Sequence, residues 1–264
     1  MTYALRLTEA ERERYRLMAE SARAEERAQW EAAGIVPGAR VADIGCGPGA
    51  VLRLLAEEVG DGGRADGVDL DSGAVAAAAE QVADLAQASA RVGEAAATRL
   101  DPGSYDVVMC RHVLAHNGGH EAAILAHLVE LARPGGAIYL VDVDGAAMRL
   151  HPDDPDIADL NARYVELHRF RGNNINIGPT LGALLETAGL QVESFRSGGP
   201  VYRVPPQLRP PSWAARDALV AAGLATARDL SRWAAAFERV DALATRPWMT
   251  VASFIAVGRK PGNG

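Results

Sequence analysis

Apolar residues between positions 40 and 145 fall in short blocks that alternate with longer amphipathic segments. The blocks at 41–45, 64–70, 88–93, 105–110 and 137–143 predict strands, and the segments at 50–59, 72–88 and 119–132 predict helices. A turn at 133–136, with the sequence RPGG, should end the last of these helices and redirect the chain into the fifth strand. Strands and helices that alternate at this spacing are typical of a parallel sheet with helices on both faces.

A highly charged helix is predicted before these blocks. Thr8 and Glu11 match a capping box, and the helix should end before Gly34. Two interpretations of this helix are open. It is either a solvated helix that packs through one apolar stripe, or a lid over the functional site in which Tyr15 or Met18 contacts a ligand.

The pattern changes after Asp144. Further helices are predicted at 153–171, 178–188, 213–222 and 226–244, together with a strand at 190–204 that turns near Gly198 and a final strand at 250–260. No internal repeat or low-complexity linker separates this half from the first. We therefore predict one domain, with a helical arm at 1–36, an α/β core at 37–150, cap helices and substrate-side elements at 151–250, and a final strand and tail at 251–264.

Charge and composition narrow the possible partners. The 27 basic and 34 acidic residues give a net charge of -7, so no broad basic surface is expected for a nucleic acid. No signal segment is evident, and no apolar run reaches the roughly eighteen residues that span a bilayer, so we expect a cytoplasmic protein without a membrane partner. The two cysteines, Cys46 and Cys110, match neither a disulfide framework nor a zinc pattern.

The densest chemical signal is the segment VADIGCGPGA at 41–50, in which a strand ends near Asp43 and glycines open a helix. Glycines allow a backbone to approach a ligand closely, because a Cβ atom would clash. Gly45, Gly47 and Ala50 also fit the glycine pattern of a dinucleotide site, and Asp69 lies at the distance of a ribose-binding acid. By itself the segment leaves a nicotinamide cofactor open.

Polar residues follow the next three strands as well. Asp69 ends the second strand, Glu94 follows the third, and the segment RHVLAH at 111–116 follows the fourth. In a parallel sheet these positions are carboxyl ends, where ligands bind at the point of strand-order reversal. One ligand could therefore contact all of them.

Five motifs stand in order between residues 35 and 145: ADIGCGPG, GVDLD, VGEAA, YDVVMCRHVLAH and LARPGGAIYLVDVD. Together they resemble the class I S-adenosylmethionine-dependent methyltransferases that act on small molecules. The segments AGLQVESF and SFIAVGRKP resemble the last two strands of that family, of which the final one is antiparallel. The resemblance implies a doubly wound, mostly parallel seven-stranded α/β sheet with an antiparallel last strand, plus the N-terminal helix and inserted cap helices.

The resemblance also implies which residues bind the cofactor. The methionine part would contact Asp43, Gly45, Cys46, Gly47 and Gly49, the ribose Asp69, the adenine Leu70, Glu94 and Ala95, and the sulfonium side Cys110 and Arg111. Two carboxylates suit a cation with a ribose diol, whereas a pyrophosphate prefers a helix N-terminus without a nearby anion. Asp43 could equally cap the amides of the glycine segment.

Methyl transfer is an in-line displacement, so much of the catalysis can come from holding the acceptor on axis and excluding water. An alcohol or ammonium acceptor also needs a base. His112 and His116 are candidates because they lie four residues apart beyond the fourth strand, on what should be one helical face; Asp144 is the next candidate. Packing near the cofactor is the other interpretation of the two histidines. No metal is predicted, because two glycines interrupt the spacing from His116 to His120.

The segment 168–178 joins two of the additional helices and is rich in hydrogen-bonding side chains. Insertions at this place shape the acceptor pocket in the family, so Arg171, Asn173 and Asn174 are predicted to contact substrate, unless the asparagines only cap the chain. The predicted function is methylation of an oxygen or nitrogen of a small molecule such as a secondary metabolite, with S-adenosylhomocysteine as product and a homodimer as the candidate assembly. Two alternatives are a protein of this fold that uses the cofactor for cyclisation or structure, and a nicotinamide-dependent oxidoreductase.

Overall fold

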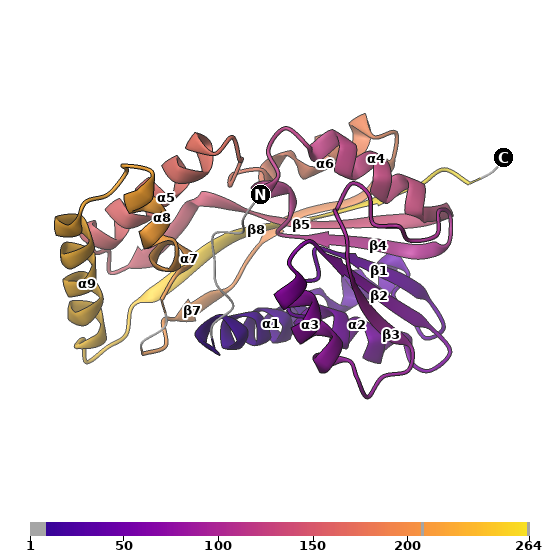
Figure 1. Ribbon diagram of the computed structural model, residues 1–264, viewed down its shortest axis with the longest axis horizontal. Helices are drawn as coiled ribbons and strands as arrows, with labels where there is room; N and C mark the ends of the chain where they lie inside the picture. Colours follow the sequence, from indigo (N-terminus) through magenta and orange to yellow (C-terminus); the bar gives the residue numbers. More distant parts are fainter. Residues whose placement is uncertain (1–8, 207–208, 263–264) are drawn as a thin grey trace.

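The computed structural model describes residues 9–206 and 209–262. Within them eight strands form one sheet, in the order β3-β2-β1-β4-β5-β8-β6, with β7 paired to β8 (Figure 1). The first five strands are β1 (Arg40–Ile44), β2 (Arg64–Asp69), β3 (Ala88–Val92), β4 (Tyr105–Arg111) and β5 (Ala132–His151). The others are β6 (Gln191–Gly198), β7 (Val201–Arg203) and β8 (Trp248–Arg259).

The strand order confirms the predicted doubly wound α/β fold. Strands β1 to β5 are parallel, and β8 runs antiparallel to its neighbours β5 and β6. The predicted count of seven strands was one too low for the described residues, because the segment 190–204 is divided into β6 and β7 at Gly199. A Cβ atom on Gly199 would lie 1.9 Å from the Val251 carbonyl oxygen, so only glycine allows the chain to pass β8 there.

Helices cover both faces of this sheet. Figure 1 shows α1 (Glu9–Ala33), α2 (Ala50–Val59) and α3 (Ser72–Gln81) together, with α4 (Glu121–Leu131) and α6 (Leu181–Thr187) on the opposite side. Two short 3₁₀ turns, η1 (Leu114–His116) and η2 (Gly178–Thr180), adjoin the second set. Two apolar clusters fill the layers, one around Leu52, Leu55 and Trp30, and the other around Leu128 and Leu181. Burial of such side chains is the main stabilising contribution, at about 1.5–3 kcal/mol each.

Two predicted boundaries were wrong. The helix expected at 72–88 ends at Gln81, because Ala88 belongs to β3 and pairs with Ala65, so the intervening residues must turn back toward the sheet. The segment 133–136 is not a separate turn between two elements but an irregular part of β5. The pairing of β5 with β4 shifts there, between the positions of Tyr105 and Val107.

Strands β5 and β8 continue well past the ends of their neighbours. Their pairing extends to His151 and Trp248, with a register shift between Asp144 and Arg149. Figure 1 shows that this extension carries a second group of helices at one end of the molecule. The group contains α5 (Pro155–Phe170), α7 (Pro211–Ala214), α8 (Arg216–Ala221) and α9 (Ala227–Asp241), and we refer to these four helices as the cap. The single helix predicted at 213–222 is divided into α7 and α8 at Ala215.

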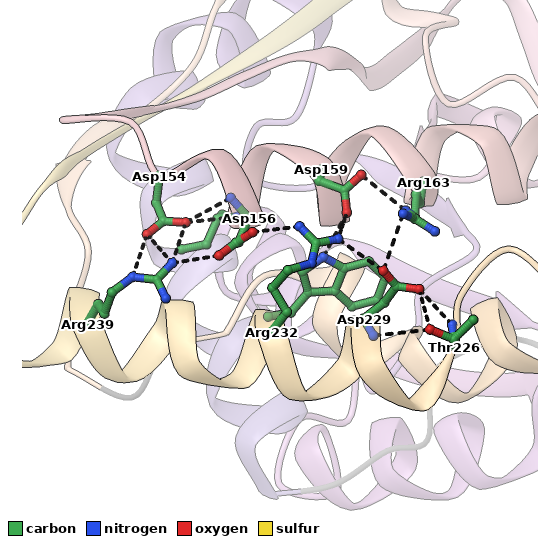
Figure 2. A network of polar contacts seen from close by, with 10 residues as sticks. Asp154, Asp156, Asp159, Arg163, Thr226, Asp229, Arg232 and Arg239 are labelled. Carbon is green, nitrogen blue, oxygen red and sulfur yellow. Dashed lines mark hydrogen bonds and ion pairs between the residues drawn. The ribbon is translucent and has the colours of Figure 1, made fainter.

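The cap has its own apolar cluster, which includes Leu160, Leu219 and the fully buried Trp233. Its two longest helices are also joined by a ladder of ion pairs (Figure 2). Arg232 on α9 donates to Asp156 at 2.6 Å and to Asp159 at 2.5 Å, both on α5. Such a network, together with the buried tryptophan, fixes α5 against α9 more firmly than isolated surface pairs would.

Candidate functional site

A cavity of about 1860 Å³ opens at the carboxyl ends of β1, β2 and β4, where the strand order reverses. Its walls come from α1, from these strand ends and from the cap side of the molecule. The predicted site residues that line it are Asp43, Gly45, Cys46, Gly47, Asp69, Leu70, Glu94, Ala95, Arg111, His112, His116, Asp144, Arg171 and Asn173. Most of the residues chosen from the sequence therefore converge on one cavity.

Asp43 is the most unusual group in this cavity. Its side chain is only 2% exposed, and among the described residues its Oδ2 atom has no hydrogen-bond partner. Burial raises the pKa of the Asp43 carboxyl to about 7, a change that the positive charge of Arg111 opposes and the negative charge of Asp69 reinforces. A buried carboxylate without a partner is costly, so this position favours a ligand that brings positive charge.

The glycine segment adopts backbone conformations that require glycine. Gly45 has a φ of 79°, and a Cβ there would lie 2.1 Å from the Val113 side chain. Gly49, expected to contact ligand, instead serves packing and does not line the cavity. A Cβ on Gly49 would lie 2.7 Å from the Ala78 Cα, so the residue allows α2 to approach α3 closely.

Asp69 organises the next strand end through backbone amides. It accepts a hydrogen bond from Gly47 N at 2.8 Å and another from Asp71 N at 2.9 Å. Leu70 beside it is 54% exposed although it is a large apolar residue, and it lies in the cavity wall. The exposed Glu94 and the half-buried Ala95 line the same region. A carboxylate next to an exposed apolar side chain suits a ribose followed by a flat base.

The two cysteines differ in position. Cys46 lines the cavity but is 7% exposed, and burial raises the pKa of its thiol well above its ordinary value. Cys110 was predicted to face the sulfonium, and this was wrong: its side chain belongs to the apolar cluster on the α4 side of the sheet. Successive strand residues point to opposite faces, so Cys110 and Arg111 cannot both face the cavity.

Arg111 makes a contact that no local pattern in the sequence predicts. Its guanidinium donates to the Glu26 carboxylate of α1 twice, at 2.5 Å and 3.0 Å. The Tyr139 hydroxyl and the Trp30 indole nitrogen also donate to Glu26, at 2.9 Å and 3.3 Å. These partners outweigh the effect of burial and lower the pKa of Glu26. Pairing across 85 residues of sequence leaves no local pattern by which Glu26 could have been identified.

The two candidate bases do not share a helical face, contrary to the prediction. His112 has a positive φ of 55° and precedes the helical turn η1, whereas His116 is the last residue of that turn. The His112 Nδ1 atom lies 3.9 Å from Asp142, a buried carboxylate that also accepts the Ala115 amide at 3.1 Å. A non-glycine residue held at positive φ indicates that the surrounding structure fixes this backbone.

A second imidazole, missed in the sequence, lies next to His116. The His168 ring on α5 is 4.9 Å from the His116 ring and 4.6 Å from the Tyr164 ring, measured between centroids. His168 lines the cavity and is 3% exposed, and neither of its nitrogens has a partner in the part of the chain that the structure describes. Burial, with smaller effects from His116 and Arg171, lowers the pKa of His168 to about 4. The ring is therefore neutral at physiological pH.

The three predicted substrate residues divide between two roles. Arg171 is exposed and lines the cavity, as does Asn173, whose side chain accepts the Gly118 amide at 3.2 Å. Asn174 is exposed, accepts the amide of Asn176 at 3.2 Å and does not line the cavity. The capping interpretation therefore describes Asn174 better than substrate contact does. Asp144 lines the cavity but lies inside β5 rather than at its end.

Helix α1 packs through one apolar stripe, as one of the two open interpretations predicted, and also reaches the cavity, where its contact with a ligand stays a prediction. One stripe of it is buried, including Ala19, Ala22 and Trp30, while Tyr15 and Met18 line the cavity. The Tyr15 ring comes within 3.6 Å of the Cβ position that Gly47 would have. Thr8, the first residue of the predicted capping box, lies outside the described part of the chain, so the capping box stays a prediction.

Neither a metal site nor a membrane-spanning helix occurs among the described residues. No group of three or more histidine, cysteine, aspartate or glutamate side chains is arranged to hold a metal ion there. No described helix is both long enough and apolar enough to cross a membrane.

Comparison with known proteins places this geometry in context. Residues 41–136 match the sequence family described as "Methyltransferase domain". Nocamycin O-methyltransferase of Saccharothrix syringae is 39% identical over 106 residues, which cover 39% of this chain and 38% of that protein. The matched stretches cover 48%, 38% and 44% of the first three curated relatives, so the chain spans less than half the length of each.

Solved structures agree on the fold. Phosphoethanolamine N-methyltransferase 2 of Haemonchus contortus, in complex with S-adenosyl-L-methionine, has a TM-score of 0.52 at 17% identity, over 86% of this chain and 49% of that chain. The cyclase SpnF has a TM-score of 0.54 at 18% identity, over 86% of this chain and 77% of that one. At these identities the likeness concerns fold. The family match itself contains the glycine segment and the ends of β1, β2 and β4.

Proposed function

Because residues 41–136 are a methyltransferase domain of the class I S-adenosylmethionine-dependent family, we propose that this chain methylates a hydroxyl oxygen of a small molecule. The observation that carries the proposal is the buried Asp43 carboxylate, which has an unpartnered oxygen in a large cavity. Such a group is stabilised by a cationic ligand. The relative named as an O-methyltransferase supports oxygen over nitrogen as the methylated atom.

The residues of the cavity fit S-adenosylmethionine. Asp43 and the backbone from Gly45 to Gly47 would hold the methionine part, and Asp69 the ribose hydroxyls. Leu70 offers the exposed apolar surface on which an adenine ring could lie. Glu94 and the Ala95 amide would then form hydrogen bonds with the polar edge of the base, with Glu94 accepting one from the amino group.

When bound, this cofactor supplies a methyl group on a positively charged sulfur, which makes the methyl carbon open to attack by a nucleophile. The protein must hold the acceptor oxygen in line with the bond to be broken and keep water out. His112 and His116, which follow β4, and Asp144, which lies within β5, line the cavity, and one of the three would accept the hydroxyl proton. Asp142, 3.9 Å from His112, would stabilise the imidazolium that forms if His112 is that base.

The acceptor would occupy the part of the cavity that faces the cap. Arg171 and Asn173 lie there, together with the His168, His116 and Tyr164 rings. The neutral His168 imidazole and the Tyr164 phenol offer both donors and acceptors of hydrogen bonds. A hydroxylated aromatic secondary metabolite matches this mixture of ring faces and polar groups.

Calorimetric titration with S-adenosylhomocysteine tests the cofactor assignment. We expect micromolar binding that weakens by about 1–3 kcal/mol in Asp69→Ala, because the ribose hydroxyls lose a charged acceptor. Asp71→Ala is the matched control, since Asp71 caps α3 through the Ala74 amide on the same loop. Tight binding of a nicotinamide dinucleotide instead would contradict the proposal.

A second candidate function is a cyclisation that uses the same fold without methyl transfer. The cyclase SpnF shares this fold, so architecture alone does not exclude such a reaction. Product analysis separates the two candidates. A methyltransferase releases one S-adenosylhomocysteine for each acceptor molecule converted, whereas a cyclase converts its substrate without forming that product.

A further inference from the structure

The buried cluster around Glu26 joins helix α1 to the floor of the cofactor cavity. Glu26 is 6% exposed, and its carboxylate accepts four hydrogen bonds. Two come from Arg111 on β4, one from Tyr139 on β5 and one from Trp30 on the same helix. A charged pair this deeply buried is kept only when its geometry and hydrogen bonding are good, which is the case here.

Arg111 and Asp43 lie on the same face of the sheet. Asp43 pairs with Met109 in the parallel register of β1 and β4, and Arg111 is two residues further along β4. Residues two apart on a strand share a face, so Asp43 and Arg111 are diagonal neighbours on adjacent strands, a spacing that a long side chain can bridge. The charge of Arg111 already acts on Asp43, yet the guanidinium hydrogen bonds are made to Glu26.

Of two nearby carboxylates, only one is therefore paired with the guanidinium. Two carboxylates, Glu26 and Asp43, lie near one guanidinium, which is bonded to Glu26, whereas Asp43 Oδ2 has no partner within the described residues. If Arg111 were free to pair with Asp43, it would neutralise the carboxylate on which the proposed cofactor site depends. Arginine pairs readily with carboxylates in two-pronged geometry, so this alternative is chemically accessible.

We propose that Glu26 is a positioning residue that holds Arg111 away from Asp43, so that the Asp43 carboxylate stays available to the cationic methionine part of the cofactor. This inference rests on the proposed function, because it takes S-adenosylmethionine as the ligand. It assigns to α1, which lies outside the matched domain at 41–136, a part in cofactor binding. Glu26 itself touches no cofactor atom in this scheme.

The test compares two ligands that share a nucleoside. S-adenosylmethionine carries a sulfonium and an ammonium, whereas methylthioadenosine has the same adenosine with a neutral thioether and no amino-acid part. Glu26→Gln keeps the size of the side chain and releases Arg111 from its charged partner. We expect its affinity for S-adenosylmethionine to fall about tenfold or more, while that for methylthioadenosine stays within about twofold.

The double variant Glu26→Gln/Arg111→Met should recover most of the lost affinity, because no cation remains to neutralise Asp43. A purely structural role of Glu26 predicts otherwise: both ligands would lose affinity together, and the double variant would bind no better. Either of those results overturns the proposal. If Glu26→Gln alone does not fold, Glu26→Asp decides: it keeps the negative charge but shortens the side chain that holds Arg111, so affinity for S-adenosylmethionine must fall more than affinity for methylthioadenosine, and an equal loss for both ligands overturns the proposal. Absence of S-adenosylmethionine binding by the wild-type protein would instead overturn the proposed function.

Discussion

At the scale of single residues, Asp43 shows how a residue proposed to bind the cofactor can lower the stability of the folded protein. The folded protein raises the pKa of this carboxyl to about 7, while the unfolded chain has an ordinary value near about 4. Between these values the folded state holds a proton that the unfolded state releases, so Asp43 lowers the free energy of unfolding as pH rises through this range. A ligand cation would recover that loss.

Asp43→Asn should therefore stabilise the ligand-free protein at pH 8 and weaken binding of S-adenosylmethionine. We expect the free energy of unfolding to rise by about 1–3 kcal/mol at pH 8 and to change much less near pH 5, measured by urea denaturation. Binding should weaken about tenfold or more in calorimetry. A variant that is destabilised equally at both pH values would contradict the charge argument.

The effect of His168 on the free energy of unfolding has the opposite dependence on pH. The pKa of His168 is about 4, below its ordinary value, so between these two values the unfolded chain binds a proton that the folded ring does not. Stability from this group is present above about pH 6.5 and is lost as pH falls toward about 4. The groups that face the ring are His116, Tyr164 and Arg171.

In the wild type, His168 should contribute a loss of about 3 kcal/mol in the free energy of unfolding over that acidic range. His168→Phe keeps an aromatic ring against Tyr164 and removes the titration. The difference between the two proteins, followed by denaturation at half-unit steps of pH, isolates His168 from Asp43, whose effect is common to both. Parallel curves for the two proteins would show that His168 is not the titrating group.

At the scale of elements, the start of helix α9 is fixed by a capping box. The Thr226 hydroxyl accepts the Asp229 amide at 3.3 Å, and the Asp229 carboxylate accepts the Thr226 amide at 2.9 Å. Thr226→Ala should lower the free energy of unfolding by about 1 kcal/mol, whereas Thr226→Ser, which keeps the hydroxyl, should lower it by less. The shift in denaturation midpoint measures both, and equal losses would contradict a role for the hydroxyl.

Elements with strong local signals could be predicted from the sequence. In residues 40–70 the alternation of apolar blocks with amphipathic segments, and the glycines between them, predicted β1, α2 and β2 close to their observed bounds. Boundaries set by tertiary pairing could not: α3 ends early because β3 begins at Ala88, and η1 is one short turn because the chain holds His112 at positive φ. In both cases a distant strand, rather than local preference, decides the conformation.

The same distinction applies to the functional site. Asp43, Asp69 and Leu70 were predicted because each lies at or next to the carboxyl end of a strand in a family-like motif, and all three line the cavity. Glu26 and His168 were missed because each lies on a helix and reaches the cavity only through packing. Cys110 was misassigned because adjacent strand residues face opposite ways, and the motif does not say which of the pair points inward.

At the scale of the whole molecule, the cap has a core separate from the cofactor side. Trp233 is fully buried in that core, donates to Asp159 at 3.0 Å and does not line the cavity. Trp233→Ala should remove about 3–5 kcal/mol from the cap. We expect turnover of the acceptor to fall steeply, while S-adenosylhomocysteine binding in calorimetry stays within about twofold. Equal loss of both would show that the cap and the cofactor side are not separable.

The long pairing of β5 with β8 has an evolutionary consequence. These two strands complete the central sheet and then continue outward, so the cap is carried on an extension of the same strand pair rather than attached by a hinge. The register shift between Asp144 and Arg149 marks where the central sheet ends and the extension that carries the cap begins. A chimera that exchanges residues 145–177 and 199–250 would replace the cap while keeping η2, α6 and β6, which belong to the central part of the sheet. Exchange of the cap between related proteins would then change the specificity for the acceptor, while the residues proposed to bind the methyl donor stay unchanged.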